Sequence, residues 1–260
     1  MKKSLLPLAL AGLVGAAEAA VVVKPVQYEI DGEAFEGLAV YDDAFTTPRP
    51  GLLMVPNWMG VNENAATKAA LLAADKYVIF VADLYGKAIR PTNADEAKVA
   101  ATTVRSDRPL MRKRAQAAVE VLKAQAGQVA LDTARLGAIG FCFGGGAVLE
   151  LARSGADLKG FVSFHGNLDT PNPRDAQNIK APVLVLHGAD DPAVPQGQVD
   201  GFVAEMKAAK ADWQLVSYGG AVHSFTNPEA TVPGRNEYHP LVAARAFKAM
   251  DNLFDETFAK

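Results

Sequence analysis

The stretch Gly140-Phe141-Cys142-Phe143-Gly144 decides how this chain is interpreted. It ends the apolar run Arg135–Phe141, which is typical of a buried strand, and it leads into the Gly/Ala-rich stretch 144–151, which is typical of a helix. Small residues on both sides of a nucleophile relieve the crowding that arises where a strand turns abruptly into a helix. The pattern therefore predicts a nucleophile elbow, with the Cys142 side chain exposed at the carboxyl edge of a sheet.

Cys142 is the single cysteine of the chain, and two other interpretations compete with the nucleophile. A lone cysteine is most often a small buried apolar residue. A glycine run after a strand can also cradle a phosphate, but Leu149 stands where the dinucleotide-binding pattern needs Gly or Ala. We therefore favour a reactive thiol, whose pKa the N-terminus of the following helix lowers. One cysteine also excludes an internal disulfide and a cysteine-based metal site.

Apolar runs and amphipathic stretches alternate along the rest of the sequence. Strands are expected at 51–56, 77–82, 135–141, 160–164, 182–186 and 214–218, and helices at 65–74, 94–126, 144–151, 199–210 and 241–254, the second with a break near Pro109. Continuous Val/Ile/Leu strands separated by helices predict an α/β fold, with a mostly parallel central sheet covered by helices on both faces. The segments Val21–Ile30 and Glu33–Tyr41 flank the turn signal Asp31-Gly32, and so predict an antiparallel hairpin at the N-terminal edge.

The composition is that of one globular domain. The chain has 260 residues, of which 50% are hydrophobic and 21% are charged, and its formal net charge is −3. The negative charge argues against nucleic acid and against an anionic membrane as partners. No spacing of His, Asp or Glu is typical of a metal site, so we expect neither a metal nor a cofactor.

Residues 1–19 have the three regions of a secretory signal peptide. Met1-Lys2-Lys3 is basic, and the apolar run Leu5–Ala17 is shorter than the roughly 20 residues that span a bilayer. Ala17-Glu18-Ala19 is a small-x-small cleavage site. We therefore expect a periplasmic or secreted protein whose mature domain is 20–260, with no stable membrane association after cleavage.

An acid and a histidine follow Cys142 in the chain order that hydrolases built on such sheets use. Asp190-Asp191 lie at the end of the strand expected at 182–186, and His223 lies just after the one expected at 214–218. Because parallel strands end at one edge of the sheet, these groups are expected to converge. The histidine would take the thiol proton, and a carboxylate would fix the tautomer of its ring. An Asp at this point is also a common turn residue, and the spacing does not choose between the two.

Three motifs together resemble the dienelactone hydrolase family: Gly140-Phe141-Cys142-Phe143-Gly144-Gly145, the stretch 188–195 and His223-Ser224-Phe225. The resemblance covers nearly all of 20–260. It implies the α/β-hydrolase fold and the hydrolysis of a small lactone, ester or thioester through a Cys-Asp-His triad and an acyl-enzyme. The family's acid stands three residues before a Val-Pro pair, which implies Asp191 rather than Asp190.

The same resemblance implies which residues surround the reacting carbonyl. The backbone N–H groups of Phe143 and Trp58 correspond to the oxyanion hole. Asn57, Lys87 and Tyr85 correspond to positions that bind substrate. Where the family has a glutamate beside the resting thiol, this chain has Asn57, which cannot take a proton. We therefore expect the cysteine to rest as a thiolate paired with a protonated histidine.

A second departure concerns the carboxylate of the substrate. Lys87 and Asn227 stand where the family's two substrate-clamping arginines do, and neither can hold a carboxylate with two parallel hydrogen bonds. Arg90 is a neighbour that could replace one of them, and a solvated surface pair is the alternative for Lys87 and Arg90. Dienelactone itself is therefore not the substrate that the sequence favours.

The sequence thus predicts a monomeric, exported thiol hydrolase that acts on a small-molecule ester or lactone. Two other functions remain open on the same scaffold. The missing glutamate and arginines favour a non-catalytic ligand-binding protein. The export signal and the expected thiolate favour a redox-responsive thiol protein.

Overall fold

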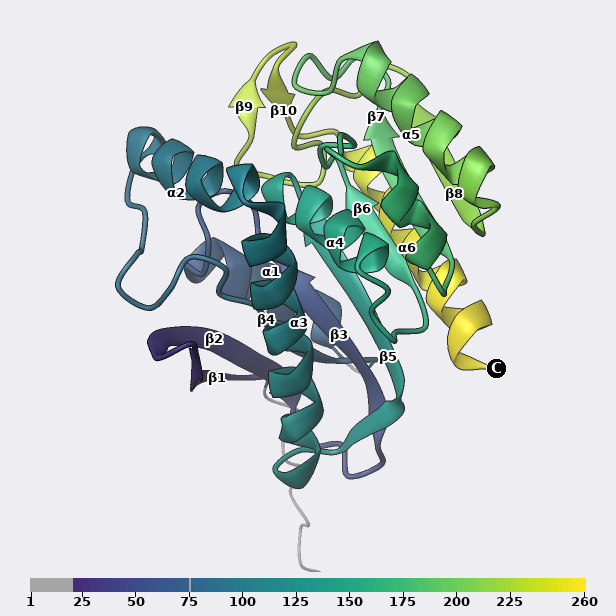
Figure 1. The fold of residues 1–260 in the computed structure, drawn as a ribbon. Coiled ribbons are helices and arrows are strands. Elements are labelled where there is room, and N and C mark those ends of the chain that lie inside the picture. Colours follow the sequence, from purple (N-terminus) through teal and green to yellow (C-terminus); the bar gives the residue numbers. More distant parts are fainter. Residues whose placement is uncertain (1–20, 75) are drawn as a thin grey trace, which may run out of the picture.

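The computed structural model describes residues 21–74 and 76–260, so the signal peptide assigned to residues 1–19 lies outside the described residues. An eight-stranded sheet forms the centre of the molecule, with the strand order β1-β2-β4-β3-β5-β6-β7-β8 (Figure 1). Its strands are β1 (Val21–Ile30), β2 (Glu33–Asp42), β3 (Arg49–Val55), β4 (Val78–Val81), β5 (Leu131–Phe141), β6 (Phe161–Phe164), β7 (Val183–Gly188) and β8 (Trp213–Tyr218). The six strands from β4 to β8 in this spatial order run parallel, whereas β2 pairs antiparallel with both β1 and β4. The mostly parallel sheet with an antiparallel N-terminal edge is therefore confirmed.

Six α-helices accompany the sheet in the described residues: α1 (Glu63–Ala73), α2 (Ala94–Ser106), α3 (Arg108–Ala124), α4 (Phe143–Arg153), α5 (Gln196–Ala209) and α6 (Pro240–Phe258). Two 3₁₀ turns, η1 (Gln125–Gly127) and η2 (Pro173–Asn178), and a small hairpin of β9 (Thr231–Val232) and β10 (Asn236–Glu237) complete them. Every strand and helix expected from the sequence is present, but η2 and the β9–β10 hairpin were not expected. No helix of the described residues is long and apolar enough to cross a membrane.

The β1–β2 turn has the backbone that its sequence demands. Asp31 and Gly32 both have positive φ angles, 53° and 80°, as a two-residue hairpin of the mirror-image type requires. The strands then pair without interruption from Val21 opposite Asp42 to Ile30 opposite Glu33. This hairpin places β1 at the outer edge of the sheet.

Helices cover both faces of the sheet because alternate strand residues point to opposite sides. Leu53 and Val55 of β3 belong to a core cluster with residues of α3 and α4, whereas Leu52 and Met54 belong to a second cluster with residues of α1 and α6. Figure 1 shows α4 and α6 on opposite faces. The break expected near Pro109 separates α2 from α3, where the Asp107 carboxylate caps α3 by accepting a hydrogen bond from the Leu110 N–H, 2.9 Å away. The two-sided α/β architecture is therefore confirmed.

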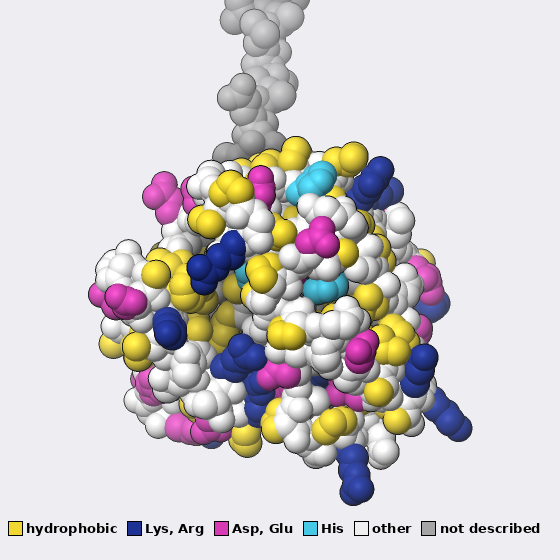
Figure 2. All heavy atoms as spheres, turned by 90° about the horizontal axis from the view of Figure 1, so that it is seen from above, with side chains coloured by type: hydrophobic (Ala, Val, Ile, Leu, Met, Phe, Trp, Pro, Cys, Tyr) yellow, Lys and Arg dark blue, Asp and Glu magenta, His cyan; other side chains and the backbone are white. Residues whose placement is uncertain are grey.

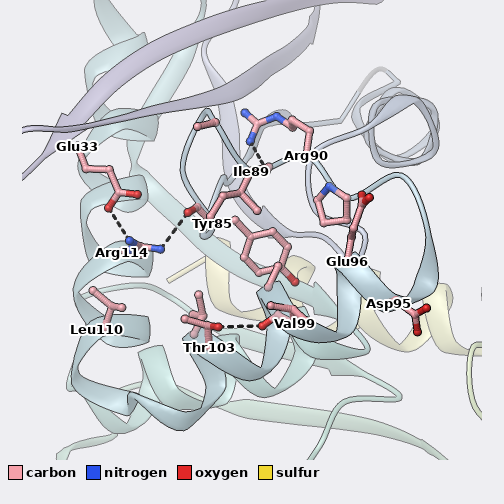
Figure 3. A pocket seen from close by; sticks show the side chains of 14 residues that line it. Glu33, Tyr85, Ile89, Arg90, Asp95, Glu96, Val99, Thr103, Leu110 and Arg114 are labelled. Carbon is pink, nitrogen blue, oxygen red and sulfur yellow. Dashed lines mark hydrogen bonds and ion pairs between the residues drawn. The ribbon is translucent and has the colours of Figure 1, made fainter.

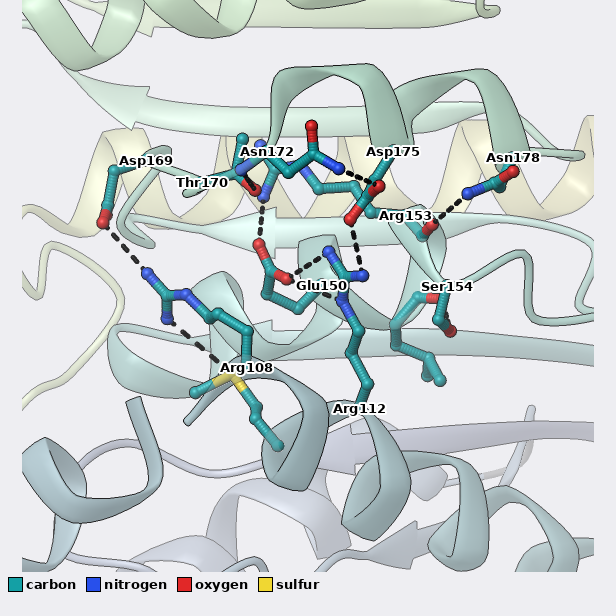
Figure 4. Close-up of polar contacts among 12 residues, drawn as sticks. Arg108, Arg112, Glu150, Arg153, Ser154, Asp169, Thr170, Asn172, Asp175 and Asn178 are labelled. Carbon is teal, nitrogen blue, oxygen red and sulfur yellow. Dashed lines mark hydrogen bonds and ion pairs between the residues drawn. The ribbon is translucent and has the colours of Figure 1, made fainter. Parts of the chain in front are cut away.

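A buried ionic network holds the far end of α4 (Figure 4). Arg153 is fully buried and pairs with Glu150, 3.0 Å away, and with Glu205 of α5. Arg112 of α3 bridges Glu150 at 2.7 Å and Asp175 of η2 at 2.6 Å. The network therefore ties α3, α5 and η2 to α4, the helix that begins at the elbow.

Candidate active site

The predicted strand–turn–helix at Cys142 is present. Cys142 lies between β5 and α4 with a φ of 56° and a ψ of −118°, a backbone conformation that a non-glycine residue adopts only under strain. Its N–H donates to the carbonyl oxygen of Phe164 at the end of β6, 3.0 Å away. A Cβ at Gly140 would collide with the carbonyl of Gly144, and a Cβ at Gly144 would collide with that of Val55. The two flanking glycines are therefore a steric requirement of the elbow.

His223 and Asp191 are joined by a hydrogen bond of 2.8 Å from the Nδ1 atom of the ring to Oδ2 of the carboxylate. Asp191 follows β7 and His223 follows β8, and both side chains are buried. The second carboxylate oxygen of Asp191 accepts from the N–H of Ala193, 2.8 Å away. The acid is therefore held at one end by its own loop while the other end orients the imidazole ring.

The Cys142 thiol forms a hydrogen bond with His223, and each group shifts the pKa of the other. Burial lowers the pKa of His223, but its hydrogen bonds with Asp191 and Cys142 and the charges of both groups raise it to about 10. Burial raises the pKa of Cys142, but the hydrogen bond and charge of His223, together with two backbone N–H groups, outweigh it, so the thiol pKa is lowered. This arrangement favours a resting thiolate and imidazolium.

The backbone N–H groups of Phe143 and Trp58 both donate to the Cys142 sulfur and help to lower its pKa. These are the two residues to which the sequence assigns the oxyanion hole. Phe143 begins α4, and Trp58 lies in the loop after β3. The side-chain oxygen of Asn57 accepts from the N–H of Met59, 3.0 Å away, which holds this loop in a tight turn. Two fixed donors therefore point at the place where a reacting carbonyl would meet the sulfur.

A cavity of about 620 Å³ opens above the thiol. It is lined by residues of the loop after β3, the elbow, the loops after β7 and β8, and the β9–β10 hairpin: Asn57, Trp58, Met59, Asn62, Asn64, Cys142, Pro192, Ala193, His223, Ser224, Asn227, Glu229, Ala230, Thr231, Val232, Arg235 and Asn236. Figure 2 looks down on this end of the molecule, where basic and acidic side chains are interspersed and histidine side chains reach the surface. In the described part of the chain, no group of three or more His, Cys, Asp or Glu residues could hold a metal ion.

Two of the predicted substrate-binding residues do not line this cavity, which corrects the sequence-based expectation. Lys87 forms an ion pair with Glu36 at 3.2 Å, on the surface. Tyr85 lies behind the oxyanion loop, where its ring contacts Phe143 at 5.5 Å between centroids and its hydroxyl donates to the Trp58 carbonyl, 2.9 Å away. The family resemblance identified the loop after β4, which carries Tyr85 and Lys87, but it did not give the direction in which these two side chains point.

Tyr85 also forms one wall of a second cavity, of about 670 Å³, between the loop 83–92 and α2 (Figure 3). The two arginines of this cavity are engaged with the protein. Arg90 pairs with Asp83 at 3.0 Å, and Arg114 donates to the Leu84 carbonyl at 2.8 Å. Arg90 therefore supports the loop that carries Tyr85 and does not reach the first cavity.

Asn227, which the sequence placed near the substrate, lines the active-site cavity, but sequence reasoning missed the segment 228–237, which closes one side of it. Its place is fixed by a hydrogen bond from the Glu237 N–H to the His223 carbonyl, at 3.1 Å. Arg235 brings a cation to the cavity wall, and Glu229 accepts a hydrogen bond from the side chain of Asn64, 2.8 Å away. Only the position of this segment directly after the histidine loop could have indicated its role.

His165, directly after β6, is a buried neighbour of the Asp191–His223 pair. Its ring meets that of His223 edge to face, with 5.2 Å between centroids, and its Nε2 atom lies 2.9 Å from the Thr226 hydroxyl. Burial and the charges of His223 and Lys68 hold the pKa of His165 well below its usual value. His165 is therefore a neutral packing partner of His223.

The fold and this site define an α/β-hydrolase, with a nucleophile elbow, an acid–histidine pair and two converging N–H donors at the carboxyl edge of a mostly parallel sheet. Residues 35–258 match the family model described as the dienelactone hydrolase family. The chain belongs to this family, and it is a hydrolase of esters or lactones.

Individual relatives agree with this assignment. The chain is 32% identical over 195 residues to a "Putative carboxymethylenebutenolidase" of Methylorubrum extorquens, which covers 68% of this chain and 64% of the relative. Among solved structures, it resembles m3DLH with a TM-score of 0.85 and 38% identity. It also resembles a dienelactone hydrolase-like promiscuous phosphotriesterase from metagenomic libraries, with a TM-score of 0.83 and 37% identity. Both structural matches cover 92% of this chain and 99% of the other.

Proposed function

We propose that this protein hydrolyses a small ester, lactone or thioester through a Cys142–His223–Asp191 triad and a thioester intermediate. The observation that carries the proposal is the convergence on one sulfur atom of the His223 side chain and the N–H groups of Phe143 and Trp58. A buried structural cysteine would not need three donors. A reacting thiolate needs the first, and its tetrahedral intermediate needs the other two.

Acylation begins with the thiolate of Cys142. Its sulfur forms a bond to the carbonyl carbon of the substrate, and the electron pair of the C=O bond moves to the oxygen. The N–H groups of Phe143 and Trp58 donate to that oxyanion, which gives them a partner more strongly charged than the substrate carbonyl. When the intermediate collapses, the leaving alkoxide takes the proton of the His223 imidazolium, and a thioester remains on Cys142.

Deacylation uses the same groups in reverse. Neutral His223 takes a proton from water, and the hydroxide adds to the thioester carbonyl. Collapse of this second intermediate breaks the C–S bond, releases the acid and restores the thiolate beside the imidazolium. Asp191 accepts from Nδ1 of His223 throughout, which leaves the other ring nitrogen to exchange the proton.

The experiment that tests this function is the release of p-nitrophenol from a short-chain p-nitrophenyl ester by the wild-type protein and by Cys142→Ala. We expect turnover that the substitution abolishes. Turnover that survives in Cys142→Ala would identify a different nucleophile. Ligand binding without turnover would favour a binding protein, and loss of alkylation after mild peroxide would favour a redox-responsive thiol.

A panel of substrates should compare neutral esters and lactones with dienelactone, which carries a carboxylate. Arg235 and Glu229 give the cavity one cation and one anion near its wall, and no pair of arginines that would clamp a carboxylate. We therefore expect neutral lactones and esters to be better substrates than dienelactone. A p-nitrophenyl phosphotriester belongs in the panel because of the relative with that activity.

We also propose that the protein is exported. The pattern of residues 1–19 supports cleavage after Ala19 and a periplasmic or secreted location. Mass spectrometry of the protein recovered from the periplasm or the medium would give the expected N-terminus at residue 20. Light scattering of that material would test the expected monomer.

A further inference from the structure

Lys68 of α1 is a half-buried cation beside Phe141, the residue that precedes the elbow cysteine. Its Nζ atom lies over the ring of Phe141, 4.2 Å from the centroid, and Phe141 directly precedes Cys142 in the chain. With Asn57 and Asn64, Lys68 and Phe141 line a void of about 10 Å³, which is room for one water molecule at most. No carboxylate of the described residues forms an ion pair with this ammonium group. The charge of Lys68 is therefore balanced by anionic groups that do not form an ion pair with it.

Two anionic groups face Lys68, and the thiolate of Cys142 has the stronger effect. Burial lowers the pKa of Lys68, while the negative charge of Cys142 and then that of Glu229 raise it, with a resulting value of about 8. The Glu229 carboxylate already accepts a hydrogen bond from Asn64. The third titratable neighbour, His165, stays neutral, in part because of the positive charge of Lys68.

Three further side chains lie around Cys142: those of His223, Tyr85 and Asn57. His223 is the cation that contacts the sulfur directly. Tyr85 keeps its proton, because burial and then the negative charges of Cys142 and Asp83 raise the pKa of its hydroxyl. Asn57, between the oxyanion loop and the Lys68 void, is a neutral amide that neither repels the thiolate nor competes for the lysine.

We infer that Lys68 is a positioning residue that stabilises the Cys142 thiolate from beneath the elbow, as a second cation in addition to His223. The inference deepens the proposed function and rests on it. In a partly enclosed site, a positive charge is attracted to a nearby thiolate more strongly than it would be in solution. Lys68 does not contact the sulfur or the substrate, so its effect is on the protonation of the nucleophile.

The test measures the thiolate without any substrate. The rate of Cys142 alkylation by iodoacetamide is followed between about pH 4 and pH 9, because only the thiolate reacts. Since Cys142 is the single cysteine, the rate reports on this site alone. The variants are Lys68→Met, which keeps the length and removes the charge, and Lys68→Arg, which keeps the charge. Lys98→Met, at an exposed position of α2, is the matched control.

We expect the alkylation profile of Lys68→Met to shift to higher pH, with a rate at about pH 6 that is about threefold to tenfold lower than that of the wild type. Lys68→Arg should restore most of the rate, and Lys98→Met should leave it unchanged. An unshifted profile in Lys68→Met would overturn the inference, and so would an equal loss in the Met and Arg variants, because that result would indicate a need for shape and not for charge.

Circular dichroism identifies a variant that fails to fold, and Lys68→Gln then replaces Lys68→Met in the same measurement. The two proposals fail separately. An unshifted profile beside normal ester hydrolysis would reject the role of Lys68 alone. A shifted profile in a protein whose turnover survives Cys142→Ala would reject the proposed function and keep the role of Lys68.

Discussion

The Tyr85 hydroxyl donates to the carbonyl oxygen of Trp58 over 2.9 Å, and the N–H of the same Trp58 donates to the Cys142 sulfur. The Tyr85 hydroxyl therefore holds the carbonyl of Trp58, while the N–H of Trp58 faces the Cys142 sulfur. The ring of Tyr85 also packs against Phe143, which carries the other donor. A side chain outside the active-site cavity thus sets the position of both N–H groups.

This relationship predicts that Tyr85→Phe lowers kcat for ester hydrolysis by about tenfold and changes KM little. The ring and its packing remain, but the Trp58 peptide loses its anchor, and a donor that is poorly aimed costs transition-state stabilisation. Steady-state kinetics on a p-nitrophenyl ester measures both constants. A rise in KM at constant kcat would instead mean that the hydroxyl acts in substrate binding.

The catalytic pair predicts a bell-shaped dependence of kcat/KM on pH. Activity should rise as the pH passes the lowered pKa of Cys142, because the thiolate is the nucleophile. It should fall as the pH approaches about 10, where His223 loses the proton that the leaving group needs. Alkylation needs only the thiolate and should show the rising limb without the fall. A falling limb near the ordinary pKa of histidine would contradict the assignment.

The elbow predicts opposite effects of alanine at two helical glycines. Gly144→Ala should lower the free energy of unfolding by about 1–3 kcal/mol, because the new Cβ meets the carbonyl groups of Val55 and Pro56. Gly201→Ala, in α5, has open space around its Cβ and should raise stability by about 0.5–1 kcal/mol. Urea denaturation of both variants measures the difference. Equal effects would mean that the elbow can relax around a side chain.

The ionic network predicts that Arg153→Met costs about 3–5 kcal/mol of stability, because Glu205 stays buried without its cation and Glu150 keeps only Arg112. Burial already raises the pKa of Glu205. A carboxyl with a raised folded-state pKa destabilises the protein as the pH rises, so the cost should be larger at about pH 8 than at about pH 5. Lys123→Met, which removes an exposed pair, should change stability by about 0.5 kcal/mol or less. A cost that does not depend on pH would point to lost packing alone.

Much of the fold could be predicted because its signals are local. The apolar runs that became β4 and β6, and the turn at Asp31-Gly32, each specify their structure within a few residues. The candidate site followed from topology, since Cys142 and His223 each stand where a parallel strand ends. These features depend on backbone direction, which a sequence pattern encodes well.

The directions of individual side chains could not be predicted from the sequence pattern. Tyr85 stands one residue from Leu84 in the expected loop, yet its ring points behind the oxyanion hole because Phe143 and Trp58 offer it contacts there. Lys68 looks like an ordinary helical lysine until the sheet brings the Phe141 ring beneath it. Such contacts join residues far apart in the chain, and only the packed structure selects them.

The outer strand of the sheet has a consequence for how the protein behaves at high concentration. β1 keeps its register with β2 through Pro25, opposite Leu38, so the nitrogen of this proline must face away from the sheet. A strand from another molecule that approached this border would find no N–H donor at Pro25 for its carbonyl groups, and it would meet the charge of Lys24 beside it. The chain therefore carries, within its first described strand, a built-in barrier to fibril-like self-association.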